Sequence, residues 1–227
     1  MDHPLRHLAV LTIAALLCGS EAEANDAPLP PPDQPGAGAG AATLARMPAS
    51  RLRLGALDIV LEETTLAQVQ AALAAGRIAE RGDAGDHILW LCYTVEGEHA
   101  RQRLWLVSSG ELGGAEHVVD GVAAAVVPAG APVPASCPLL PARLTLSLDR
   151  EIWLGLTRDE LIRRLGKPSE ERGEALDFAY DGGIKLAPGR PESADEQELD
   201  LDVTSTLRVE LSEGRAARLW ASKITSD

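Results

Sequence analysis

Aromatic residues are scarce in this sequence of 227 residues, which contains one Phe, two Tyr and four Trp. Any core must therefore be filled mainly by Leu, Val, Ile and Ala. Cysteine is also scarce: the chain has three and no CxxC spacing, which leaves no dithiol redox motif. The sequence further lacks a GxSxG serine motif and a phosphate-binding loop, so it carries no such signature of a hydrolase or a nucleotide-binding enzyme.

Histidine is too sparse to form a recognisable metal motif. Only His87, His99 and His117 follow the first 24 residues, with neither an HxxxH nor an HExxH spacing. The acidic run that ends in ELDLDV alternates with apolar residues, as in a solvated strand edge, and does not match a calcium loop. We therefore expect no metal, no cofactor and no catalytic residues, and predict that the chain is not an enzyme. A hydrolase is the alternative, because Asp86-His87 with a serine, or two carboxylates, could meet in space.

The charge balance is strongly negative, with a formal net charge of −13 for the full chain. Residues 1–24 hold one Arg against one Asp and two Glu, a net of −2, so the remainder carries about −11. A surface this acidic repels phosphate groups. We therefore expect no nucleic acid and no anionic membrane surface as a partner.

Residues 1–24 are typical of a secretory signal peptide. Arg6 precedes the apolar run LAVLTIAALL, and Ala22-Glu23-Ala24 offers the small residues that a signal peptidase recognises. The run has ten residues, too few to span a bilayer core of about 30 Å. The alternative is a lipoprotein signal cleaved before Cys18, although Leu17 is bulky where such signals have a small residue. We predict a periplasmic or secreted protein, attached to a membrane only if Cys18 is lipidated.

Removal of that signal would leave two cysteines, Cys92 and Cys137, in an oxidising compartment. An even number of cysteines in such a compartment indicates a disulfide. Closing a loop of this length restricts the unfolded chain and stabilises the fold by about 4 kcal/mol. Two buried free thiols are the alternative.

Residues 25–50 are predicted to be a disordered linker. Pro, Gly and Ala dominate this stretch and no apolar periodicity is present, so it cannot bury enough surface to offset its ordering entropy. The ordered part of the chain is expected to span residues 51–227.

A short capped helix is predicted in the second half of the chain. Thr157 and Glu160 form the pattern of a capping box, and Leu161 begins an apolar stripe. Gly166 and Pro168 then end the helix.

The same pattern occurs 92 residues earlier in the chain. The matching residues there are Thr65, Gln68, Val69 and Leu73. An extended segment follows each helix, which predicts two copies of a helix-then-strands unit, residues 51–140 and 141–227. Short turns between the strand-like segments predict antiparallel order.

Alternation within the predicted strands indicates a binding face. Leu104 and Leu106 point to one side of their strand, and Leu207 and Val209 do so in the final hairpin. The residues on the opposite side, which we predict to bind a partner, are Trp105, Trp220, Arg101, Arg103, Arg208 and Arg218. Trp and Arg together are the composition of an interface hot spot.

An alternative for that face is that arginine stems shield tryptophans at the edge of a core. We interpret the other two tryptophans as packing residues. Trp90 alternates with Cys92 and is expected to pack around the disulfide, and Trp153 is expected in the core.

The stretch from Leu154-Gly155-Leu156-Thr157 to Leu165-Gly166-Lys167-Pro168, followed by an extended segment ending at Tyr180, resembles the small outer-membrane assembly lipoproteins of the BamE (SmpA/OmlA) type. Two such units in tandem resemble the beta-lactamase-inhibitor-protein fold. This resemblance implies helices on one side of a curved antiparallel sheet and an open opposite side for a protein partner. No inhibitory loop can be matched, so no inhibitor activity is implied.

We therefore expect an α+β fold of two tandem helix-plus-antiparallel-strand units that form a curved sheet with helices on one face. The expected function is an exported, non-enzymatic protein-binding module of the bacterial cell envelope that binds a protein through the open sheet face. A periplasmic hydrolase with a site between the two halves is the alternative, and a structural or ligand-storage role is a third. The sequence carries no signal for a particular oligomeric state.

Overall fold

The computed structural model describes residues 27–33, 44–83, 86–97, 100–110, 113–114, 116–141, 144–185 and 200–226. The predicted signal peptide, with Cys18, lies outside these ranges. So do His99 and most of the acidic run that ends at Asp202.

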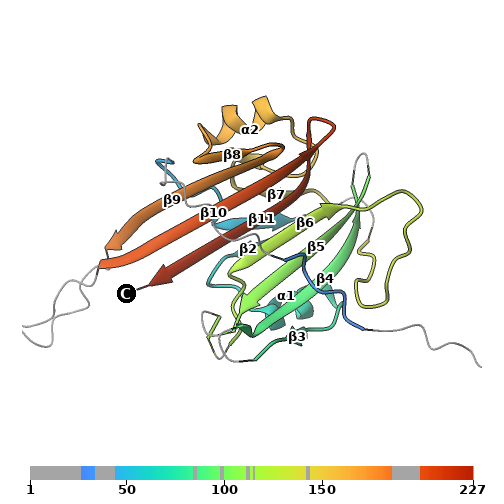
Figure 1. Cartoon of the computed structure of the whole chain (residues 1–227). Helices are drawn as coiled ribbons and strands as arrows, with labels where there is room; N and C mark the ends of the chain where they lie inside the picture. The colour runs from blue at the N-terminus through green and yellow to red at the C-terminus, as the bar shows by residue number, and fades with distance from the viewer. Residues whose placement is uncertain are drawn as a thin grey trace, which may run out of the picture.

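The described chain contains two α-helices, one 3-10 turn and eleven strands (Figure 1). The helices are α1 (Leu66–Leu73) and α2 (Arg158–Leu165), and the 3-10 turn is η2 (Asp149–Glu151). The strands of the first half are β1 (Arg51–Leu54), β2 (Leu57–Val60), β3 (Ala79–Arg81), β4 (Ile88–Glu96), β5 (Arg101–Ser109) and β6 (Gly121–Val126). Those of the second half are β7 (Leu146–Leu148), β8 (Glu170–Arg172), β9 (Ala175–Lys185), β10 (Asp200–Ser212) and β11 (Arg215–Ser226).

Eight strands form one antiparallel sheet in the order β3-β4-β5-β6-β11-β10-β9-β8. Strands β3 to β6 make one half of it and β8 to β11 make the other half in reverse order, so the halves meet where β6 pairs with β11. A helix precedes the strands of each half. The organisation into two copies, residues 51–140 and 141–227, stays a prediction. A separate sheet has the order β2-β1-β7.

The prediction of an α+β fold with two balanced helix-and-strand units is wrong. Strands account for 48% of the structure and helical segments for 12%, with two helices in the part of the chain that is described, so the fold is mostly β. The physical reason is that each helix has only eight residues. Eight residues rise about 12 Å along the helix axis and cannot cover so wide a sheet. The alternating sequence RLRL and the turn at Gly55 form the extra sheet that completes the cover.

Both helices begin as their sequences predict. In α1 the Thr65 hydroxyl accepts from the Gln68 amide at 3.1 Å, and the Gln68 side chain accepts from the Thr65 amide at 2.9 Å. In α2 the Glu160 carboxylate accepts from the Thr157 amide at 2.8 Å, and the Thr157 hydroxyl accepts from the Glu160 amide at 3.4 Å. These reciprocal bonds satisfy amides that a helix N-terminus leaves free. The bonds from Thr157 also lower the pKa of Glu160.

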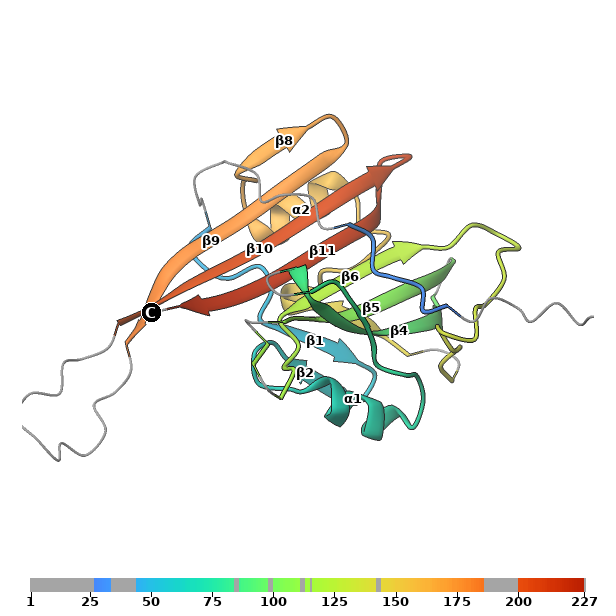
Figure 2. The ribbon, with the colours of Figure 1, turned by 60° about the horizontal axis from the view of Figure 1, so that its bottom comes forward.

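The main core lies on one face of the eight-stranded sheet, under a layer formed by α1, α2 and the sheet β2-β1-β7 (Figure 2). Its largest fully buried side chains are Tyr93, Phe178, Leu52, Leu54, Ile59, Leu61, Leu66, Leu91, Leu104, Leu106, Leu140 and Ile152. Tyr93 donates its hydroxyl hydrogen to the Ala75 carbonyl at 3.1 Å, and burial raises the pKa of Tyr93 to about 12. Aliphatic residues thus fill most of the core, as the composition requires.

The opposite face of the eight-stranded sheet, which carries Trp90, Trp105 and Trp220, is called the second face below. Residues 27–33 cross it in the blue segment of Figure 1. The loop 127–140 also folds over it, because a disulfide and several hydrogen bonds connect the two. The second face is therefore not as open as the sequence analysis expected.

The prediction that residues 25–50 form a disordered linker needs correction at two places. Residues 27–33 contact the second face, and residues 44–50 contribute Leu44 and Ala49 to buried positions of the main core. The segment lacks periodicity, but single apolar side chains within it find apolar partners that are distant in sequence. Residues 34–43 lie outside the described ranges.

Candidate functional site

All six residues that were predicted to bind a partner lie on the second face. One row of directly paired residues across the strands consists of Cys92, Trp105, Ala123, Trp220, Arg208 and Asp177. The next row consists of Thr94, Arg103, Ala125, Arg218 and Glu210, and Arg101 pairs with Glu96 beyond it. Directly opposed residues of antiparallel strands point to the same side. Strand alternation therefore placed these side chains on one surface, and their role in binding stays a prediction.

Three tryptophans form the apolar centre of the second face, and we call Trp90, Trp105 and Trp220 the tryptophan cluster. Their exposed fractions are 3%, 5% and 7%. Ala123 lies between Trp105 and Trp220 on the central strand, and its small side chain leaves room for the two indoles. Trp153 does not belong to this cluster, because it lies in the main core on the other side.

The disulfide between Cys92 and Cys137 confirms the predicted pairing and joins the loop 127–140 to β4. Trp90 packs in the same cluster as these two cysteines, as its alternation with Cys92 indicated. Thr94 fastens the loop further, since its hydroxyl donates to the Cys137 carbonyl at 2.7 Å. The loop therefore forms a fixed wall beside the tryptophan cluster.

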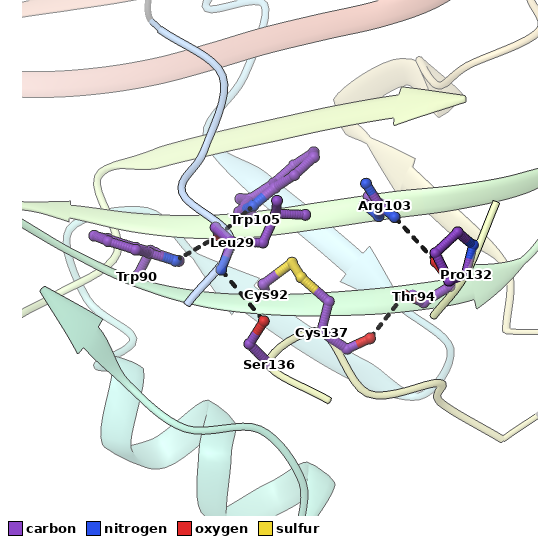
Figure 3. The surroundings of a disulfide bond; sticks show 9 residues. All are labelled: Leu29, Trp90, Cys92, Thr94, Arg103, Trp105, Pro132, Ser136 and Cys137. Carbon is purple, nitrogen blue, oxygen red and sulfur yellow. Dashed lines mark hydrogen bonds between the residues drawn. A yellow bond between two sulfur atoms is a disulfide. The ribbon is translucent and has the colours of Figure 1, made fainter. Parts of the chain in front are cut away.

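The tryptophan cluster binds a segment of the same chain, and Figure 3 shows how two of its members, Trp90 and Trp105, contact Leu29. The Trp90 Nε1–H donates to the Leu29 carbonyl at 2.9 Å, and the Trp105 Nε1–H donates to the same oxygen at 3.2 Å. The Trp220 Nε1–H donates to the Pro32 carbonyl at 3.4 Å. Every indole N–H of the cluster is thus directed at a backbone carbonyl of one extended segment. The sequence analysis missed this contact.

The segment that crosses the tryptophan cluster has the sequence APLPPPD, residues 27–33. Pro31 is buried, and Leu29 packs against the apolar cluster that includes the disulfide. The Leu29 amide donates to the Ser136 hydroxyl at 3.3 Å, on the wall formed by the loop 127–140. The run of prolines was the available signal, because a stiff extended segment can dock on aromatic side chains.

Two of the predicted arginines hold the loop 127–140 in place. The Arg101 guanidinium pairs with Glu96 at 2.8 Å and donates to the Ala131 carbonyl at 3.3 Å. The Arg103 guanidinium donates to the Pro132 carbonyl at 3.2 Å. These arginines therefore contact the protein itself, next to the tryptophan cluster.

The other two predicted arginines belong to a group of ion pairs on β9, β10 and β11. Arg208 lies 3.6 Å from an Asp177 carboxylate oxygen and 3.8 Å from one of Glu210, and Arg218 lies 2.9 Å from Glu210. The Arg218 side chain is 56% exposed, so its pair is screened by water and contributes little to stability.

A cavity of about 370 Å³ opens beside Trp220, where β6 and β11 meet under the end of the proline segment. Its wall includes Pro32, Arg81, Ser109, Asp120, Trp220 and Ser222. Both halves of the sheet contribute to the cavity, which is the location proposed for a hydrolase site. The lining that can be described contains carboxylates and serines but no histidine. A serine–histidine–acid arrangement is therefore not formed by these residues.

Asp120 is a buried carboxyl group in the wall of this cavity, with 4% of its surface exposed. Burial raises its pKa to about 6, although hydrogen bonds from Ser109 oppose the shift. The Ser109 amide donates to Oδ2 at 2.9 Å, and the Ser109 hydroxyl donates to Oδ1 at 3.2 Å. The carboxyl therefore changes charge near pH 6 and can accept hydrogen bonds at the cavity wall.

Neither a metal cluster nor a membrane-spanning helix is found in the described ranges. No three His, Cys, Asp or Glu residues there are placed to hold a metal ion. None of the helices in this part of the chain is long and apolar enough to cross a membrane.

Comparison with known proteins gives no relative: no family model matches the chain, and no curated protein and no solved structure matches it. The resemblance to the BamE type and to the beta-lactamase-inhibitor-protein fold therefore stays an expectation from the sequence.

Proposed function

We propose that the chain is a non-enzymatic protein-binding module of the bacterial cell envelope, and that it binds an extended protein segment on the tryptophan cluster of the second face. One observation carries the proposal. All three indole N–H groups of the cluster are hydrogen-bonded to backbone carbonyls of a single extended segment. A surface that recognises the backbone in this way accepts a peptide as its ligand.

The composition of the surface supports the same function. Trp and Arg dominate interface hot spots because they combine a large contact area with hydrogen-bond donors. Arg103 and Arg218 lie in the row next to Trp105 and Trp220, two residues away along the same strands. A bound protein would therefore meet an apolar floor bordered by cationic groups.

The proposed compartment rests on the predicted signal peptide and on the disulfide. Disulfides persist in oxidising environments such as the periplasm or the exterior. Mass spectrometry of the native N-terminus tests this: cleavage by signal peptidase gives a chain beginning near Asn25. A lipid-modified Cys18 at the N-terminus would instead place the module on a membrane.

Site-specific photocrosslinking in cells tests the binding function. A photoreactive amino acid at Arg218, which is exposed on the second face, should give adducts with a protein partner. The matched control is Arg215 on the same strand, whose guanidinium donates to the Gly155 carbonyl and thus lies away from the cluster. Adding Trp105→Ala and Trp220→Ala should abolish the adducts at position 218. Equal adducts at both positions, or adducts that survive the double substitution, would rule out this surface.

A further inference from the structure

We infer that the ligand of the tryptophan cluster is a proline-rich segment in the polyproline II conformation, supplied by another polypeptide, and that residues 27–33 are an internal competitor for the same surface. This inference rests on the proposed function and names the class of its partner. Four observations lead to it, concerning hydrogen bonding, spacing, packing and the strength of attachment.

The hydrogen-bonding groups of the surface match those of proline. Proline has no backbone N–H and offers only its carbonyl oxygen. An indole offers only a donor. Three indole donors, from Trp90, Trp105 and Trp220, therefore complement a segment that supplies carbonyl acceptors and few amide donors. The Leu29 amide of the segment donates to the acceptor oxygen of the Ser136 side chain.

The spacing of the accepting carbonyls equals one turn of polyproline II. Trp90 and Trp105 bind the carbonyl of Leu29, and Trp220 binds that of Pro32, three residues further. A polyproline II helix has three residues per turn, so residues 29 and 32 present their carbonyls to the same side. No backbone–backbone hydrogen bond joins residues 27–33 to another described residue. The surface thus binds through side chains and does not add a strand to the sheet.

The apolar contacts also follow this pattern. Pro31 is buried, whereas Pro30 is exposed, so the segment has one side on the protein and one toward water. Leu29 packs against the cluster that contains the disulfide. Aromatic-lined grooves bind proline-rich ligands in this manner, because the stiff ligand loses little conformational entropy.

The attachment of residues 27–33 is weak enough for exchange. Besides the indole bonds, the Leu29–Ser136 bond and the apolar contacts, the segment has an ion pair at 3.7 Å between Asp33 and Arg81, and the Asp33 side chain is 97% exposed. An exposed pair of this kind is screened by water and contributes little to the attachment. The segment belongs to the same chain as the surface, and an intramolecular competitor acts at a local concentration on the order of millimolar. A partner with more contacts can therefore displace it.

Indole N–H signals in NMR spectra of the full mature chain test the inference. We would compare wild type with a variant in which Leu29, Pro30, Pro31 and Pro32 are replaced by serine, and titrate each with the free peptide APLPPPD. In the variant, the peptide should shift the indole signals of the tryptophan cluster toward their wild-type positions. The indole of Trp153, which donates to Gln102 at 2.8 Å in the main core, is the internal control and should not move.

Two comparisons make the result decisive. The peptide AALAAAD, which lacks proline, should bind the variant at least about tenfold more weakly, because it must be ordered on binding. Wild type should bind APLPPPD about tenfold more weakly than the variant does, because its own segment competes at a millimolar local concentration.

Each other outcome overturns the inference in a recognisable way. Equal binding of both peptides would show that the surface does not select proline, and would leave the proposed function standing if the crosslinks at position 218 persist. If millimolar peptide leaves the indole signals unchanged, residues 27–33 are a permanent part of the fold and do not exchange with a ligand. The crosslinking experiment alone would then test the proposed function. If the serine variant fails to fold, wild type with a spin-labelled APLPPPD peptide replaces it. Broadening of the cluster indoles without broadening of Trp153 supports exchange, and absence of broadening overturns it.

Discussion

On the second face, the half formed by β4, β5 and β6 places indoles under a proline-rich segment, whereas the half formed by β9 and β10 places arginines beside carboxylates. At equal distance from the β6–β11 junction, Trp105 corresponds to Arg208, and Cys92 corresponds to Asp177. The main-core sides of the same strands are apolar in both halves. Positions that face the core are thus constrained by packing, and the alternate positions are free to acquire different chemistry.

The largest effect should come from the core side of the half with ion pairs. Phe178→Ala removes a side chain that is 1% exposed and should lower the free energy of unfolding by about 3–5 kcal/mol. Arg218→Ala, on the second face, removes an ion pair whose guanidinium is 56% exposed and should lower it by about 1 kcal/mol or less. Chemical denaturation of both variants measures the difference. Similar losses would show that the ion pairs support the fold as much as the core does.

The disulfide should have the next largest effect. Among the described residues it lies in the half formed by β3 to β6, where it joins β4 to the loop 127–140. Replacing Cys92 and Cys137 by serine should lower the free energy of unfolding by about 2–5 kcal/mol, because the unfolded chain regains freedom. Denaturation of wild type with and without reductant gives the same quantity independently. The double variant is the control, since reductant should not change its stability.

Asp120 should make stability depend on pH. Its pKa is raised from 3.8 to about 6 on folding, so between these values the folded state binds a proton that the unfolded state does not. The contribution of Asp120 to stability should therefore be largest below about pH 4. It should fall by up to about 3 kcal/mol as the pH rises through 6. Asp120→Asn should remove the slope.

The comparison of wild type with Asp120→Asn at each pH isolates this contribution from that of other carboxylates. The acceptor oxygen of asparagine can still bind Ser109. Parallel stability curves for the two proteins between pH 4 and pH 6 would contradict the proposed burial of the carboxyl.

The smallest effects should come from the two helix caps, where the halves are most alike. Thr65→Ala and Thr157→Ala each remove a side-chain acceptor from a capping box and should each cost about 1 kcal/mol. Thermal unfolding can resolve such changes. Matching losses would support equivalent roles for α1 and α2, and a loss confined to one variant would separate the halves further.

Local signals in the sequence predicted several parts of the structure correctly. The pairs Thr65–Gln68 and Thr157–Glu160 specify helix starts through bonds within one turn, which no distant contact has to supply. Alternation in β5 and β11 similarly assigned Trp105 and Trp220 to the side away from the main core, because the side-chain period of a strand is fixed at two. The disulfide followed from cysteine number and predicted compartment.

The parts that were missed depend on contacts between distant residues. Docking of residues 27–33 requires Trp90, Trp105 and Trp220 to lie together, and those tryptophans come from three strands. The sheet β2-β1-β7 likewise pairs Leu52 with Leu148, which are far apart in the chain. Alternation such as RLRL indicates a strand but does not name its partner strand, so the whole cover of the sheet was assigned to the helices although the extra sheet supplies part of it.

The large sheet ends on each side in a strand of only three residues, β3 and β8, and both carry charged side chains. A strand of another molecule can add to a sheet by pairing with the free backbone groups of its edge strand. A short edge strand presents few such groups, and its charged side chains disfavour the approach of another strand. A protein that is mostly β is thereby protected from edge-to-edge aggregation. Its contacts with other proteins would then be restricted to a face of the sheet, where side chains can discriminate between partners.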